Sequence, residues 1–152
     1  MAHEWHGKKV LVLGLGDTGL SCLRWLASKG AQVRAADTRE APPALGAARE
    51  AVPGIRIDLG EFRSQVLEGM DAVVASPGIA LSQPILRDAV ARGLDVAGDI
   101  ELFGREIQRA APGAGVLGIT GTNGKSTVTA LTGHLLRAAG IDCEVEIGRA
   151  HV

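Results

Sequence analysis

The sequence predicts an α/β fold, in which a Rossmann-like, doubly wound parallel sheet is followed by the beginning of a second α/β unit. Apolar strand-like runs alternate with helix-like runs from residue 8 to residue 111. A glycine-rich turn, VLGLGDTGLS, follows the first run, and a second one, GITGTNGKSTVTA, comes after a glycine- and proline-containing break. Strands that alternate with helices favour a parallel sheet with right-handed crossovers.

Five strands are expected in the first part of the chain. The first reads KKVLVL, a continuous apolar run of the kind that a parallel sheet buries on both faces. The runs AQVRAADT, IRIDLGE, MDAVVASPG and LDVAGD follow at intervals that leave room for helices. They predict strands at residues 31–38, 55–61, 70–78 and 94–99.

Helices are expected between these strands. Residues 19–30 repeat apolar side chains at helical spacing, and Gly30 ends the run. Pro84 fits the first turn of a helix over residues 82–93. A short helix at 41–54, a single turn at 63–69 and a helix at 100–111 capped by Asp99 complete the set.

The stretch APGAG at residues 111–115 marks the expected domain boundary. It divides the chain into a Rossmann-like domain at residues 1–111 and the beginning of an ATP-binding domain at residues 112–145. We expect a strand at 116–120, a loop at 121–127 and a helix at 126–140. One strand and one helix leave an apolar face uncovered, so the second domain is expected to be truncated.

Composition excludes several classes of function. The chain has 152 residues, of which 46% are hydrophobic, and its 16 basic and 17 acidic residues give a net charge of -1. No basic field is available for nucleic acid, and no apolar run is long enough for a membrane span or a secretory signal. We therefore expect a cytoplasmic protein. Neither the two cysteines nor the four histidines form a disulfide or metal pattern.

The first glycine loop fits the pattern G-x-G-x-x-G with Gly14, Gly16 and Gly19. In such a loop, backbone N–H groups and a helix N-terminus face a diphosphate. Asp37 ends the next strand, at the position where Rossmann domains hold a ribose. The pattern indicates an anionic nucleotide, although an acidic Asp17 in the loop disfavours the usual dinucleotide pose. The alternative is that the glycines only permit tight packing.

A turn with the sequence ASPGI ends the strand at 70–78 and is expected at the same edge of the sheet. Ser76 and the backbone of Gly78 could reach a phosphate there. An ordinary strand-ending turn is the alternative.

The second glycine loop is typical of triphosphate binding. Its first glycines lie at 118 and 121, whereas the generic P-loop places one at 119. Gly124 lets the backbone curl, Lys125 suits the β- and γ-phosphates, and Ser126 can offer its hydroxyl to Mg²⁺. Thr127 is next in line for a phosphate oxygen. A purely solvated Lys125 is a poor alternative, because a cation at a helix N-terminus opposes the helix dipole.

Five motifs in order, GLGDTGLS, ADTR, ASPGIA, GDIELF and ITGTNGKSTVT, resemble the N-terminal part of the Mur ligases, in particular the members that add D-glutamate. The resemblance covers residues 7–141. It implies that the first loop serves a UDP-sugar and the second serves ATP.

By this resemblance, the uridine diphosphate part of the substrate would be held by Asp17, Thr18, Asp37, Thr38, Arg39, Ser76, Pro77 and Gly78. ATP and Mg²⁺ would be held by Asn123, Gly124, Lys125, Ser126 and Thr127, with Ser126 as the magnesium ligand and Lys125 as the catalytic residue. The implied activity is an ATP-dependent carbon–nitrogen ligase of peptidoglycan synthesis, with UDP-N-acetylmuramoyl-L-alanine and D-glutamate as substrates, and a monomer is expected.

The chain departs from the family pattern near its end. It reads DCEVEIGRAHV where the family continues through a glycine-rich segment. A common sequencing-adapter DNA translates to EIGRAHV, so we expect residues 146–152 to be non-native and the chain to be inactive alone. The alternative function is a stand-alone UDP-sugar or dinucleotide-binding module with a vestigial P-loop. A folylpolyglutamate synthase is disfavoured, because that relative lacks the N-terminal domain.

Overall fold

The computed structural model describes residues 3–80 and 82–146 of the chain. They form two compact units, which divide between Pro112 and Gly113. Among the described residues, no helix is both long enough and apolar enough to cross a membrane.

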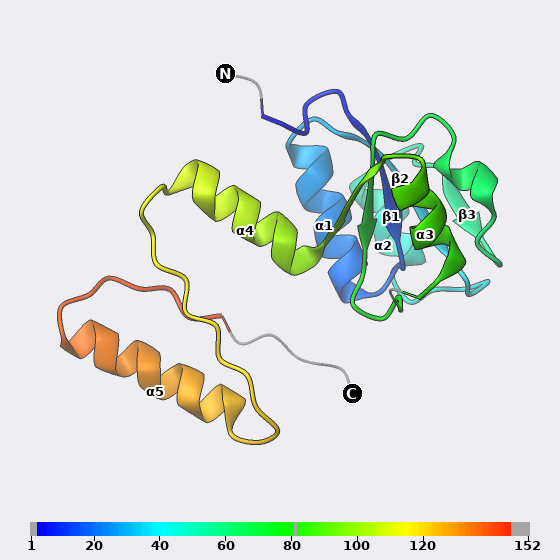
Figure 1. The fold of residues 1–152 in the computed structure, drawn as a ribbon. Coiled ribbons are helices and arrows are strands. Elements are labelled where there is room, and N and C mark those ends of the chain that lie inside the picture. The colour runs from blue at the N-terminus through cyan, green and yellow to red at the C-terminus, as the bar shows by residue number, and fades with distance from the viewer. Residues whose placement is uncertain (1–2, 81, 147–152) are drawn as a thin grey trace. The chain divides into compact units, whose positions relative to one another are not determined.

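The first unit is built on a five-stranded parallel sheet with the strand order β3-β2-β1-β4-β5 (Figure 1). Its strands are β1 (Lys9–Leu13), β2 (Gln32–Asp37), β3 (Ile57–Leu59), β4 (Ala72–Ala75) and β5 (Asp95–Gly98). Its helices are α1 (Asp17–Ser28), α2 (Leu45–Ala51), the short 3₁₀ helix η1 (Ser64–Leu67), α3 (Pro84–Ala91) and α4 (Asp99–Ala110). The predicted doubly wound α/β fold is confirmed.

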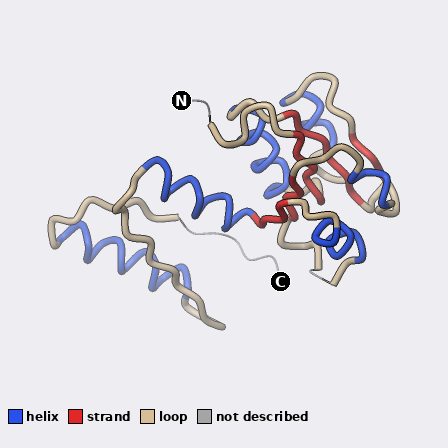
Figure 2. Tube along the Cα trace, turned by 45° about the horizontal axis from the view of Figure 1, so that its top comes forward, coloured by secondary structure: helices blue, strands red, loops and turns tan. Residues whose placement is uncertain are grey.

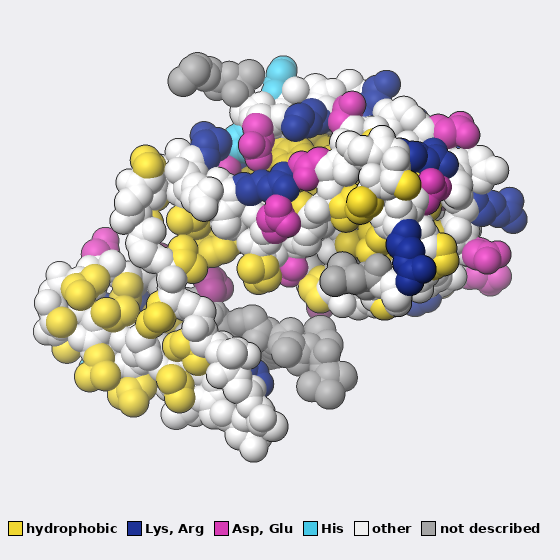
Figure 3. All heavy atoms as spheres, in the orientation of Figure 1, with side chains coloured by type: hydrophobic (Ala, Val, Ile, Leu, Met, Phe, Trp, Pro, Cys, Tyr) yellow, Lys and Arg dark blue, Asp and Glu magenta, His cyan; other side chains and the backbone are white. Residues whose placement is uncertain are grey.

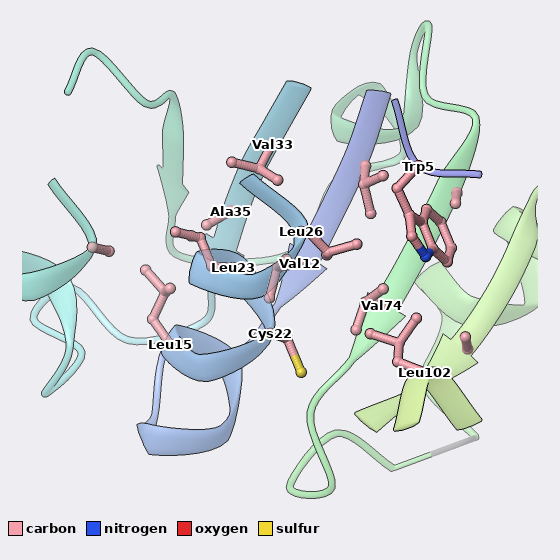
Figure 4. Close-up of a cluster of buried hydrophobic side chains, with 14 of the residues drawn as sticks. Trp5, Val12, Leu15, Cys22, Leu23, Leu26, Val33, Ala35, Val74 and Leu102 are labelled. Carbon is pink, nitrogen blue, oxygen red and sulfur yellow. The ribbon is translucent and has the colours of Figure 1, made fainter. Parts of the chain in front are cut away.

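Two hydrophobic clusters, one on each face of the sheet, hold this unit together. On one face, Cys22, Leu23 and Leu26 of α1 pack against strand residues such as Val12 and Val74 (Figure 4). On the other face, α3 and η1 cover Leu11, Leu13 and Val73. Helices therefore flank the strands on both sides, as Figure 2 shows. Burial, with the nearby Asp99 charge, raises the pKa of the Cys22 thiol to about 11, so this thiol packs as a neutral group.

The strand order places a topological switch point between β1 and β4. From β1 the chain first builds β2 and β3 on one side, and then crosses to β4 and β5 on the other. Open parallel sheets bind ligands outside the carboxyl ends of their strands at such a point. The first glycine loop, which follows β1, lies there.

The second unit contains one helix, α5 (Lys125–Ala138), among its described residues. Val128, Leu131 and Leu135 share one face of α5 and are each about half exposed. Figure 3 shows hydrophobic side chains on the surface of this unit. Of the predicted non-native tail, residues 147–152 lie outside the described residues.

The strand predicted at residues 116–120 is wrong. These residues have no strand structure, and Val116 and Leu117 are 64% and 68% exposed. A β-strand exists through hydrogen bonds to a neighbouring strand, and the described part of the second unit offers no strand to pair with. The predicted cap is also wrong, because Gly98 is the N-cap of α4 and Asp99 lies in the first turn.

Candidate nucleotide-binding site

The first glycine loop connects β1 to α1 by a turn in which two glycines are required for steric reasons. Gly14 has φ +89°, and a Cβ there would lie 3.2 Å from the Cβ of Ser76. A Cβ on Gly19 would collide with the carbonyl oxygen of Gly14. By contrast, a Cβ on Gly16, the N-cap of α1, would have nothing within 4 Å. Gly14 and Gly19 thus close the turn, while Gly16 leaves open space beside the helix N-terminus.

Asp37 fixes this loop to the end of β2. Its side chain is buried, and one oxygen, Oδ2, accepts a hydrogen bond from the backbone N–H of Leu15 at 2.7 Å. The guanidinium of Arg39 donates to both carboxylate oxygens, at 2.8 Å and 2.6 Å, and the Arg39 N–H donates to Oδ1 at 2.9 Å. The carboxylate of Asp37 is therefore fully engaged by the protein itself.

The charge of Asp37 is stabilised by these bonds. Burial by itself would raise the pKa of this carboxyl, but the Arg39 guanidinium and the N–H groups of Leu15 and Arg39 outweigh it and lower the pKa from 3.8 to about 2. Asp37 is thus ionised at neutral pH and holds Arg39, which is half exposed, at the edge of the site.

Ser76 joins the third loop to the first. Its hydroxyl donates to the carbonyl of Gly14 at 3.1 Å, and its N–H donates to the carbonyl of Leu13 at 3.0 Å. Pro77 and Gly78 follow as an exposed turn. The structure therefore brings the loops after β1, β2 and β4 together at one edge of the sheet.

The remaining predicted residues of this edge lie at its surface. Asp17 and Thr38 are exposed, and Thr18 is half-buried in the first turn of α1. The first N–H groups of a helix have no partner within the helix, so the N–H groups of residues 17–19 are available to an anion. Arg39 is held in place by Asp37, and the backbone N–H groups at the start of α1 are donors that the site offers to a diphosphate.

In the second unit, Gly124 and Lys125 form a tight loop at the start of α5. Gly124 is the N-cap and has φ +74°, the left-handed conformation that favours glycine. The ammonium of Lys125 donates to the carbonyl of Gly121 at 2.6 Å, which folds the side chain back over the loop. Asn123, Ser126 and Thr127 are exposed beside it. The loop carries an ammonium and open N–H groups at one point, which suits a phosphate group.

Sequence reasoning missed the internal bonds of the first site. The pattern placed Asp37 where Rossmann domains bind a ribose, and nothing in the spacing indicated the bond to Leu15. The ADTR motif held one usable signal, because an arginine two residues after a strand-ending aspartate can fold back and pair with it.

Two surface hollows lie elsewhere in the first unit, one lined by α1 and α4 and the other at the amino ends of the strands. Among the described residues, no group of three or more possible ligands could hold a metal ion.

Residues 8–98 match the family model described as the N-terminal domain of MurD-like Mur ligases. The chain belongs to this family. It is 50% identical over 150 residues to the UDP-N-acetylmuramoylalanine–D-glutamate ligase of Thiobacillus denitrificans, with coverage of 92% of this chain and 32% of the relative. The enzyme of the same name from Escherichia coli is 44% identical over 142 residues, with coverage of 93% and 31%. The chain thus spans under one third of the length of these family members.

Solved structures agree with the family's fold. A pseudomurein peptide ligase type C from Methanothermus fervidus superposes with a TM-score of 0.54 at 28% identity, covering 88% of this chain and 27% of that one. The UDP-N-acetylmuramate-alanine ligase of Thermotoga maritima gives a TM-score of 0.56 at 22% identity, with coverage of 87% and 30%. At 22% identity, the likeness to the Thermotoga maritima ligase shows only that the two chains share a fold.

Proposed function

We propose that this chain forms the nucleotide-sugar-binding domain, and the beginning of the ATP-binding domain, of an ATP-dependent ligase that joins D-glutamate to UDP-N-acetylmuramoyl-L-alanine. The observation that carries the proposal is the match of residues 8–98 to the MurD-like family. The UDP-N-acetylmuramoylalanine–D-glutamate ligases at 44% and 50% identity support it. In this proposal, residues 1–111 bind the UDP-sugar, residues 112–145 begin the ATP-binding domain, and residues 146–152 are not native.

The geometry of the first site favours a UDP-sugar over a dinucleotide. A dinucleotide-binding Rossmann domain uses the carboxylate after its second strand to hold a ribose diol. Asp37 occupies that position, but its oxygens already accept bonds from Leu15 and Arg39. The diphosphate would instead meet the N-terminus of α1 beside Gly16, with Thr18, Ser76, Pro77 and Gly78 around it. Thr38 and Arg39 would contact the nucleoside end, and Asp17 would point to the sugar or to solvent.

The second loop would bind ATP. Lys125 would exchange its bond to the Gly121 carbonyl for the β- and γ-phosphates, and Thr127 and the loop N–H groups would hold the remaining oxygens. Asn123 and Gly124 would shape the loop. The hydroxyl of Ser126 suits Mg²⁺, which would supply charge neutralisation on the phosphates.

In the proposed reaction, the γ-phosphoryl group passes from ATP to the carboxylate of the alanine, which gives an acyl phosphate and ADP. The amine of D-glutamate then displaces phosphate and forms the amide. Lys125 acts by offsetting negative charge on the phosphoryl group as it transfers. A cytoplasmic location and a monomeric state are also part of the proposal.

Phosphate release by the polypeptide extended to the length of its relatives tests this function. Release should require ATP, UDP-N-acetylmuramoyl-L-alanine and D-glutamate together, and L-glutamate in place of D-glutamate is the control. The Lys125→Ala variant should lose the activity. Release that does not depend on the muramoyl nucleotide, or no release with all three substrates, would contradict the proposal.

A further inference from the structure

A surface hollow of about 340 Å³ lies at the amino ends of β1, β2 and β3, at the edge of the sheet opposite the glycine loop. Lys9, Gln32 and Arg34 line it from β1 and β2. Arg56 lines it from the residue before β3, and Met70 from the residues that precede β4.

The charged residues of the hollow stand where a doubly wound sheet is normally apolar. β1 and β2 are interior strands of the sheet, and interior parallel strands are usually apolar on both faces. The register pairs Lys9 with Gln32 and Leu11 with Arg34. Because side chains alternate along a strand, Lys9 and Arg34 share the face on which Leu11 is buried. Two cations therefore interrupt an apolar sheet face at its amino edge.

The ion pairs formed by the described residues leave these two cations without a carboxylate partner. Arg56 pairs with Asp58 at 3.0 Å. Among the described residues, no acidic group lies within ion-pair distance of the side chain of Lys9 or Arg34. The nearby carboxylate of Asp71 accepts a hydrogen bond from the backbone N–H of Lys9 at 2.7 Å, and Arg34 is half-buried. The hollow therefore holds excess positive charge, of which the half-buried Arg34 is partly shielded from water and Lys9 is exposed.

The walls of the hollow limit what it can bind. Its apolar lining comes from Val52, Pro53, Ile55 and Met70, and Gly54 also lines it. Two uncommitted donors, one a guanidinium and the other an ammonium, match an anion with several oxygens, such as a phosphate group. The volume admits a small molecule.

We propose that the hollow between the amino ends of β1, β2 and β3 binds a small phosphate-bearing anion through Lys9 and Arg34. This site goes beyond the proposed ligase function, because it lies at the opposite edge of the sheet from the loops assigned to the substrates. Its failure would leave the proposed function untouched.

Titration of the ¹⁵N-labelled chain with inorganic pyrophosphate, followed by NMR at constant ionic strength, tests the proposal. The amide signals of residues 32–34 and 54–56 should shift and saturate. The Lys9→Gln/Arg34→Gln double variant should weaken this binding by about tenfold or more, since it removes two charge-assisted hydrogen bonds. Any shifts at residues 16–18 report the glycine loop and should stay unchanged in the double variant.

The control is Arg87→Gln, which removes an exposed cation on α3 and should leave the affinity as it is. If the double variant fails to fold, the single Lys9→Gln variant replaces it, because Lys9 is exposed and its backbone bonds remain. Shifts that do not saturate would overturn the proposal. So would an affinity that the variants at Lys9 and Arg34 leave unchanged, or that Arg87→Gln lowers equally.

Discussion

At the scale of single residues, Asp37 connects two loops of the first site. One buried carboxylate ties the glycine loop to β2 through Leu15 and orients Arg39 at the edge of the site. A buried charge is stable only when it is paired and hydrogen-bonded, and Asp37 meets both conditions. We infer that its contribution to nucleotide binding is indirect, through the shape of the loop and the position of Arg39.

We expect Asp37→Asn to destabilise the first unit by about 2 kcal/mol or more, because it leaves Arg39 without its charge partner and weakens the bond to Leu15. Denaturant unfolding of the chain, followed by circular dichroism, measures this. The matched control is Asp58→Asn, which breaks an ion pair with the exposed Arg56 and should cost less than about 1 kcal/mol. Equal losses in the two variants would contradict the inference.

The ion pair between Asp37 and Arg39 predicts that the free energy of unfolding of the first unit depends on pH in the acid range. A carboxyl whose pKa falls from 3.8 to about 2 on folding stabilises the fold above its unfolded pKa and loses that contribution as the pH falls through its folded pKa. The difference in unfolding free energy between the wild type and Asp37→Asn should be constant above about pH 5 and shrink between about pH 4 and pH 2. If the difference between the two proteins does not change between about pH 4 and pH 2, the protonation of Asp37 is not coupled to folding as we expect.

For Lys125, removal of the ammonium should weaken the attraction between the second loop and a triphosphate, because the loop N–H groups remain. In the full-length polypeptide, Lys125→Ala should weaken ATP binding by about tenfold to a hundredfold, measured by calorimetry. Arg137→Ala removes a cation at the other end of α5 and serves as the control. Unchanged ATP affinity in Lys125→Ala would contradict the assignment of this loop.

At the scale of elements, the glycine loop combines two different steric requirements, at Gly14 and Gly19, within six residues. Gly14 needs a positive φ, Gly19 needs the absence of a Cβ, and Gly16 needs neither. Structural requirements alone therefore explain Gly14 and Gly19 without any ligand. The open space at Gly16 is the feature that points to a ligand, because a bound diphosphate would occupy it.

This distinction predicts opposite effects of two alanine substitutions. Gly19→Ala should destabilise the first unit by about 1–3 kcal/mol, because the new methyl group meets the carbonyl of Gly14. Gly16→Ala should change stability by less than about 1 kcal/mol but should block binding of the UDP-sugar. Gly46→Ala in α2, where a Cβ has nothing within 4 Å, is the control for both unfolding and binding. Binding that survives Gly16→Ala would place the diphosphate elsewhere.

The sequence predicted the sheet well, because apolar runs and glycine stops report on elements that pack locally. The run at residues 8–13, for example, became β1, which is buried from Val10 onward. It failed at residues 116–120, where the run has strand-like composition but strand formation depends on a neighbour that the described residues lack. In the site, glycine spacing located the loop after β1, whereas the bonds of Asp37 and Ser76 depend on tertiary placement and left no periodic signal.

At the scale of the whole molecule, the first unit has a core on each face of its sheet, and the described part of the second unit has almost none. In the first unit, even α4 has few buried contacts. It buries Leu102 alone, while Arg105 pairs with Asp95 at 2.6 Å and Glu106 contacts Lys29 at 3.2 Å. In the second unit, Gly133 is the buried residue of α5. The two units should therefore differ greatly in local stability.

Hydrogen exchange measures that difference. Amides of β1 and β4 should exchange only through global unfolding of the first unit, whereas amides of α5 should exchange faster by orders of magnitude. Extension of the chain to the length of its relatives should slow exchange in α5, because added chain can cover Val128, Leu131 and Leu135. Amides of β1 are the internal control. Strong protection of α5 in the present chain would contradict this description.

Calorimetric titration of this chain with UDP-N-acetylmuramoyl-L-alanine, and separately with NAD, tests the central claim most directly. That claim is that the edge of the sheet at β1 and β4 binds a sugar nucleotide, while Asp37 holds the loop instead of a ribose. We predict saturable binding of the muramoyl nucleotide, weakened by Gly16→Ala, and no binding of NAD. Binding of NAD with no uptake of the muramoyl nucleotide would contradict the claim.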